Sequence, residues 1–140
     1  MISREKIYTF IDKQKTAFVA SVDEDGYPNI KAMFAPRKRD GNCFYFSTNT
    51  SSMRTAQFLK NPKASIYFYT RSRFGCEGIM LVGTMEVLED EESKRLIWQT
   101  GDTLYYPKGV KDPDYCVFRF TALKGRHYHN LDNESFSMTD

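Results

Sequence analysis

Apolar residues along the chain fall into short stretches, where they alternate with polar residues or run together, and turn-forming residues separate these stretches. Short stretches of this kind, rich in β-branched and aromatic side chains, are typical of β-strands. A period of two places Ile30, Ala32 and Phe34 on one face of such a strand. Strands are expected at residues 17–22, 29–34, 44–46, 64–69, 76–88 and 115–120, with residues 123–130 extending the last one.

Three other stretches have the spacing or composition of helices. Ile7, Phe10 and Ile11 form one apolar stripe near the N-terminus. Residues 52–60 are good helix formers that end at an Asn-Pro pair, and residues 91–99 begin with an acidic turn. About six or seven strands with three short helices favour an antiparallel, mainly β fold, such as a small β-barrel with short helices, over a doubly wound parallel sheet.

The composition is that of a single folded domain, residues 1–140, with 41% hydrophobic and 15% aromatic residues. The polar residues 131–140 are expected to form a flexible tail. A net charge of +2 is too small to indicate a nucleic-acid or membrane partner. No apolar run reaches the roughly 18 residues that span a membrane, and no apolar core of a secretory signal follows the first residues. The expected location is therefore the cytoplasm.

The residue types that bind metals are few. Cys43, Cys76 and Cys116 are odd in number and have no C-x-x-C spacing, which argues against a disulfide framework and against a zinc site. His127 and His129 would share one face of a strand, but no further ligand is identifiable in the sequence. An exposed or edge-strand histidine pair is favoured over a metal site, and no metal is expected.

One stretch, residues 44–54, has the composition of a phosphate-binding turn. Three aromatic residues that predict a strand are followed by five hydroxyl or amide residues and then by the second helix. Free backbone N–H groups, hydroxyl donors and a cation in the first helical turn would suit a phosphate dianion. Lys31 or part of the basic run 37–39 could supply a second cation. The same residues also fit a helix that Thr50 or Ser51 merely caps, and the stretch alone does not decide between the two.

A third interpretation is a barrel that binds single-stranded nucleic acid. Residues 40–46 resemble the aromatic strands of cold-shock and RRM domains, on which bases stack. The near-neutral charge of the chain is unlike that of a nucleic-acid-binding protein, so a nucleic-acid partner is not expected.

Four segments, in order and at fitting spacing, are similar to the motifs of one known family. Residues 25–33 contain a Gly-x-Pro hairpin followed by Lys-Ala-Met, and residues 45–54 have an aromatic-Ser-Thr-Asn-x-x-Ser pattern. Residues 83–90 end a long strand with Gly-Thr-Met-Glu-Val, and residues 105–114 have an aromatic-Pro-x-Gly-x-x-Asp-Pro pattern. The chain thereby resembles the pyridoxamine phosphate oxidase-like superfamily of FMN-binding split barrels, and within it the bacterial general stress protein 26 group.

The resemblance implies an antiparallel split barrel that binds FMN, with Arg54 in place of the family's usual Lys. It also implies a homodimer with flavin at the interface. The residues that it assigns to the cofactor site are Lys31, Ala32, Met33, Ser47, Thr48, Ser52, Met53 and Arg54.

For the reaction, the resemblance implies an FMN-dependent oxidoreductase of the stress-response type, whose substrate and catalytic residues the sequence does not identify. The C-terminal substrate motif of the pyridoxamine phosphate oxidases proper has no counterpart after Phe120, so vitamin B6 oxidation is not expected. A flavin-binding sensor or carrier without turnover, and a deazaflavin- or haem-handling relative, stand as alternatives.

Overall fold

A computed structural model describes residues 1–139, and Asp140 lies outside the described residues. The elements are α1 (Arg4–Asp12), β1 (Thr16–Val22), β2 (Pro28–Phe34), β3 (Lys38–Asp40), β4 (Cys43–Asn49), α2 (Met53–Lys60), β5 (Lys63–Ser72), β6 (Gly75–Leu88), α3 (Glu91–Ile97), the 3-10 turns η1 (Thr100–Leu104) and η2 (Gly109–Lys111), β7 (Tyr115–His129) and β8 (Asp132–Ser137). None of the helices in this part of the chain is long and apolar enough to cross a membrane.

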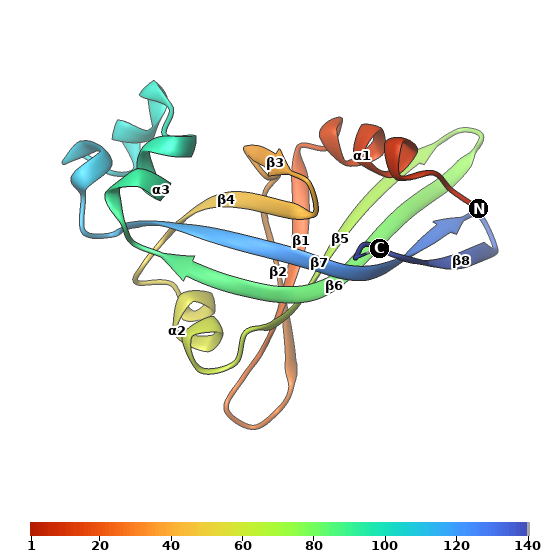
Figure 1. Ribbon diagram of the computed structural model, residues 1–140, viewed down its shortest axis with the longest axis horizontal. Helices are drawn as coiled ribbons and strands as arrows, with labels where there is room; N and C mark the ends of the chain where they lie inside the picture. Colours follow the sequence, from red (N-terminus) through yellow and green to blue (C-terminus); the bar gives the residue numbers. More distant parts are fainter. Residues whose placement is uncertain (140) are drawn as a thin grey trace.

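The strands form one antiparallel sheet in the order β2-β1-β5-β6-β7-β4-β3, with β8 paired to β7. The long strands β6 and β7 run along the molecule, whereas β1 and β2 cross their direction (Figure 1). In the described chain the edge strands β2 and β3 do not pair with each other, so hydrogen bonding does not close the sheet. The predicted antiparallel, mainly β split-barrel fold is confirmed.

The core lies against the strand pair β4 and β7. Phe44 and Phe46 are in register with Phe120 and Phe118, respectively, and all four rings are fully buried. Burial of each such ring stabilises the fold by about 1.5–3 kcal/mol. The two isoleucines of the predicted apolar stripe on α1 are buried against the same core. The aromatic run that predicted a strand therefore joins β4 to the core.

Two segments differ from the sequence-based expectation. A flexible tail is predicted at residues 131–140, but residues 132–137 form β8 and pair with β7. Phe136 and Met138 are buried in the core, which holds this otherwise polar segment in place. The tail prediction is therefore wrong within residues 131–139. No strand is predicted between residues 34 and 44, but residues 38–40 pair with β4 as the short strand β3.

Gly83 lies where the register between β6 and β7 shifts by one residue. A Cβ atom at this position would lie 1.9 Å from the backbone oxygen of Thr121. We expect Gly83→Ala to lower the free energy of unfolding by about 1–3 kcal/mol, because the two strands must move apart. Gly101→Ala is the matched control, since a Cβ there meets no atom within 4 Å. Urea unfolding of the two variants measures the difference, and equal midpoints would contradict the expectation.

Candidate functional site

The turn between β4 and α2 is fixed by Asp114, which directly precedes β7. The Thr50 hydroxyl and the Ser51 N–H each donate to Asp114 Oδ1 at 3.0 Å. Hydrogen bonds from Ser51 and Thr50 hold the pKa of Asp114 below its usual value. The cap of α2 is Ser52, whose Oγ accepts from the Thr55 N–H at 3.1 Å. The alternative in which Thr50 or Ser51 caps the helix is therefore wrong.

Two buried polar atoms beside this turn have no hydrogen-bond partner within residues 1–139, namely Thr48 Oγ1 and Arg54 Nε. Thr48 lies near the end of β4, and Arg54 lies in the first turn of α2. Burial lowers the pKa of Arg54, because desolvation disfavours its charged form. Buried polar atoms in native proteins nearly always have partners. A ligand that accepts and donates hydrogen bonds here would supply the missing ones.

These atoms lie at a hollow of about 370 Å³, the main hollow, between β2, β4, α2 and the turns after α3. This volume is within the usual range of small-molecule sites. A neighbouring hollow of about 430 Å³ shares Lys31, Asn49 and Arg54 with it. Of the predicted cofactor residues, the main hollow is lined by Lys31, Ala32, Met33, Ser47, Thr48 and Arg54, and the neighbouring hollow by Ser52 and Met53. The structure thus brings all eight residues together around Lys31 and Arg54.

Other residues of the main hollow are not among the eight predicted cofactor residues, although Arg37 belongs to the basic run 37–39 that could supply a second cation. They are Thr16, Phe34, Ala35, Arg37, Asn49, Asp102, Tyr105 and Tyr106. Tyr105 and Tyr106 begin residues 105–114, the last of the four segments that are similar to the family's motifs, so the sequence does carry a signal for these two residues. Nothing in the sequence marks Asp102, which reaches the hollow only through the fold.

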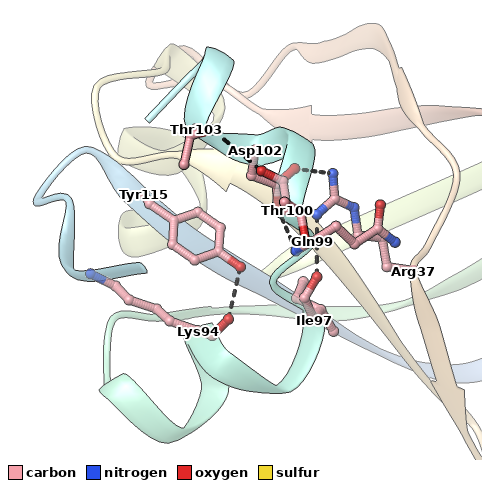
Figure 2. Close-up of polar contacts among 8 residues, drawn as sticks. All are labelled: Arg37, Lys94, Ile97, Gln99, Thr100, Asp102, Thr103 and Tyr115. Carbon is pink, nitrogen blue, oxygen red and sulfur yellow. Dashed lines mark hydrogen bonds and ion pairs between the residues drawn. The ribbon is translucent and has the colours of Figure 1, made fainter. Parts of the chain in front are cut away.

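Arg37 and Asp102 form an ion pair at the edge of the main hollow (Figure 2). Both guanidinium Nη atoms bind the carboxylate, with Arg37 Nη2 2.7 Å from Asp102 Oδ1. Arg37 also donates to the Ile97 carbonyl at 3.2 Å, and the Gln99 N–H donates to Asp102 at 2.9 Å. Burial alone would raise the pKa of Asp102, but the bonds from Arg37 and Gln99 bring it below its usual value. Arg37 therefore lines the hollow with its charge already compensated.

Lys31 and Arg54 are cations of the main hollow that form no ion pair within residues 1–139. Since Asp102 compensates Arg37, the lining carries two uncompensated positive charges. A phosphate monoester carries a charge of about −1.5 to −2 at pH 7. The two cations match such a group in sign and magnitude, and the residues present fit the phosphate of FMN.

The sequence model of the pyridoxamine 5'-phosphate oxidase family matches residues 3–129 of the chain. The chain belongs to this family. A solved structure of a protein from Clostridium acetobutylicum, related to general stress protein 26, is 40% identical, with a TM-score of 0.81 over 95% of this chain and 92% of that one. General stress protein 26 of Bacillus anthracis is 20% identical, with a TM-score of 0.75 over 95% of this chain and 96% of that one, and shows the shared fold.

Curated members of the pyridoxamine phosphate oxidase family are longer. The pyridoxine/pyridoxamine 5'-phosphate oxidase of Agrobacterium fabrum is 28% identical over 118 residues, which is 83% of this chain and 52% of that protein. The enzyme of Rhizobium leguminosarum is 35% identical over 75 residues, which is 54% of this chain and 35% of that protein. The chain therefore spans about a third to a half of the length of these relatives.

The histidine pair of this family member lies apart from the main hollow. His127 Nε2 is 2.7 Å from Glu77 Oε2, and the ring of His127 stacks on that of His129 with 6.3 Å between centroids. Among the described residues no group of three or more His, Cys, Asp or Glu is placed to hold a metal ion. His127 thus has a local hydrogen-bond partner in Glu77.

Proposed function

We propose that this member of the pyridoxamine phosphate oxidase family binds FMN and acts as an FMN-dependent oxidoreductase in the cytoplasm. Bound FMN would supply the one- and two-electron chemistry, and the protein would supply binding and orientation. The proposal of a cytoplasmic location is supported by the three cysteines, which are unpaired.

The observation that carries the FMN proposal is that Arg54 Nε and Thr48 Oγ1 are both without a hydrogen-bond partner within residues 1–139, and that both residues line the main hollow. Lys31 lines the same hollow from β2 and has no competing carboxylate within residues 1–139. We assign the phosphate to Arg54, Thr48 and Lys31, and the adjoining backbone of Ala32 and Met33 to the flavin. Ser47, Ser52 and Met53 complete the proposed site from β4 and α2.

The lining of the main hollow also bears on the reaction. Among the described residues neither a histidine nor a cysteine lines it, and the carboxylate of Asp102 is bound to Arg37. No lining group is free to act as a general base at neutral pH, so the redox chemistry would belong to the cofactor. Once Lys31 and Arg54 hold one phosphate, the described residues of one chain leave no uncompensated cation in the hollow for a phosphorylated substrate. This supports the expectation that vitamin B6 phosphates are not its substrates.

The wild-type protein is expected to take up one FMN per chain and to keep its visible absorption after gel filtration. FMN at about 100 times its dissociation constant should raise the free energy of unfolding by about 2.7 kcal/mol, because the ligand binds the folded state. An absorption spectrum and urea unfolding with and without FMN check both results. Absence of bound flavin together with an unchanged unfolding midpoint would contradict the proposal.

The same preparation can be used to distinguish an oxidoreductase from a flavin-binding sensor or carrier. In anaerobic stopped-flow experiments, NADH or NADPH should bleach the flavin of an oxidoreductase, whereas the flavin of a sensor or carrier should stay oxidised. Mass spectrometry of the extracted cofactor distinguishes FMN from a deazaflavin or haem. A titration with single-stranded oligonucleotides should be flat, since the lining fits one phosphate group and not a polymer.

We further propose that the protein is a homodimer with the main hollow at its interface. Ile30, Ala32 and Phe34 share one face of the edge strand β2, as predicted from their period of two, and the structure shows that this face is exposed. Phe18 on β1 is the registered partner of Ala32 and continues this apolar face. Phe34 also lines the main hollow. A second copy on this face would cover both the apolar residues and one side of the hollow.

Phe18→Lys is expected to shift the protein from dimer to monomer, because it places a charge in the middle of the apolar face. Leu131→Lys is the matched control, since Leu131 is 99% exposed in the turn between β7 and β8. Light scattering coupled to size-exclusion chromatography gives the mass of each variant. A monomeric wild type, or a dimeric Phe18→Lys variant, would count against this interface.

A further inference from the structure

Two adjacent tyrosines of the main hollow are held in different ways. Tyr106 is 9% exposed, and its ring centroid lies 5.0 Å from that of Tyr115. Tyr105 is 67% exposed and lines the hollow, and its hydroxyl forms no hydrogen bond within residues 1–139. Tyr106 thus anchors this part of the chain, while the ring of Tyr105 is open to a ligand.

The backbone of Asp102 fixes both tyrosines. Its carbonyl accepts from the N–H of Tyr105 at 3.0 Å and from the N–H of Tyr106 at 2.8 Å. Its carboxylate is held by Arg37 and by the Gln99 N–H, as Figure 2 shows. We call residues 99–106 the wall segment. The ion pair therefore ties the wall segment to the connection between β2 and β3.

The two sides of the main hollow differ in charge. Lys31 and Arg54 leave two uncompensated charges at β2 and α2, whereas the Arg37–Asp102 pair is neutral as a unit. The two tyrosines of the wall segment line the same hollow as this neutral pair. A ligand with an anionic group and a flat, uncharged ring would match both sides at once.

We propose that Tyr105 is the residue that contacts the ring system of the bound flavin, and that the Arg37–Asp102 pair positions it. This inference rests on the proposed FMN site and assigns the part of that site that recognises the ring. Tyr105 covers the flavin ring system, and the buried Tyr106 packs the wall segment against Tyr115.

Three probes separate the ring from the phosphate: FMN, lumiflavin, which has the ring alone, and inorganic phosphate. Tyr105→Ala is expected to lower the affinity of the protein for lumiflavin and for FMN by about 3- to 10-fold. It should also raise the fluorescence of the bound flavin, because a tyrosine ring in contact quenches flavin emission. The inhibition constant with which inorganic phosphate competes against FMN binding should stay unchanged. Tyr105→Phe should behave as wild type, and so should Tyr27→Ala, since Tyr27 is 68% exposed but lies outside the main hollow.

The positioning pair is tested through Tyr105. Like Tyr105→Ala, Asp102→Asn should lower the affinity for lumiflavin and raise the fluorescence of the bound flavin. In the Tyr105→Ala background, Asp102→Asn should cause no further loss of lumiflavin affinity, because the two changes act on one contact. Arg37→Lys serves as the second variant if Asp102→Asn does not fold, as judged by near-ultraviolet circular dichroism.

Each outcome supports or overturns one part of the proposal. If Tyr105→Ala binds FMN and lumiflavin with wild-type affinity and fluorescence, Tyr105 does not contact the ring, although the FMN site stands. Additive losses in the double variant would overturn the positioning role of Asp102. If wild type binds inorganic phosphate but neither FMN nor lumiflavin, both the FMN site and the ring contact are wrong.

Discussion

Replacing Arg54 by alanine is expected to weaken FMN binding by about 10- to 100-fold. A hydrogen bond to a charged group is worth about 1.5–3 kcal/mol, and each 1.4 kcal/mol is about a tenfold change in affinity. The guanidinium has a buried Nε without a partner, so the ligand would receive a bond that the free protein does not use. Equilibrium titration of flavin fluorescence measures the loss.

The stability of the FMN-free protein makes this prediction specific. Arg54→Ala should leave the free energy of unfolding unchanged or raise it, because burial lowers the pKa of Arg54 and no ion pair is lost. Lys60→Ala is the control on the same helix, since Lys60 pairs with Glu24 away from the main hollow. It should keep the wild-type FMN affinity. An Arg54→Ala variant with wild-type affinity, or with a marked loss of stability, would refute the assignment of Arg54 to the phosphate.

Asp102→Ala is expected to lower the free energy of unfolding by about 3–5 kcal/mol, because it leaves the Arg37 guanidinium without its carboxylate. The side chains of Arg37 and Asp102 are only 19% and 5% exposed. The variant also removes the bond to the Gln99 N–H that begins η1. Urea unfolding without FMN gives the magnitude. The double variant Arg37→Met with Asp102→Leu should recover part of the loss, since it removes both charges.

The pair also predicts a pH dependence. The pKa of folded Asp102 is lowered, because the bonds from Arg37 and Gln99 outweigh the effect of burial. The pair therefore contributes stability above the pKa of the unfolded carboxyl, and this contribution is lost as the pH falls through the lower, folded value. The free energies of unfolding of wild type and Asp102→Ala, measured by urea unfolding from neutral to acid pH, should converge as the pH falls. A constant difference down to strongly acid pH would contradict this explanation.

The local parts of the fold and site could be predicted from the sequence, since their signals lie within a few residues. The aromatic run and the hydroxyl residues before Arg54 indicated a strand, a turn and a helix, and the structure has β4 and α2 there. Alternation in β2 predicts that Ile30 and Phe34 share one face, and the structure shows that this face is exposed. The sequence does not identify the residue that caps α2, because Thr50, Ser51 and Ser52 have the same capping chemistry. Only the tertiary contact to Asp114 assigns the first two to another role.

The distant parts could not be predicted in this way. Arg37 and Asp102 are 65 positions apart, and neither has a local pattern that indicates its partner. Within the wall segment, the sequence does not show which of the two tyrosines is buried, because Tyr105 and Tyr106 are adjacent and lie in a loop-rich stretch without a periodic pattern. β8 was missed since its alternation is weak and Phe136 is its one large apolar residue.

The position of β7 in the sheet has a consequence for the order in which the protein matures during synthesis. β4, which carries Ser47 and Thr48, is bordered by the three-residue strand β3 on one side and by β7 on the other. A nascent chain that ends before Asp114 already contains all eight proposed cofactor residues but lacks β7, the long strand that pairs with β4. It also lacks Asp114, which fixes the turn before α2. Cofactor capture on the ribosome is therefore expected to begin only after β7 has emerged, and the unpaired edge of β4 is exposed until then.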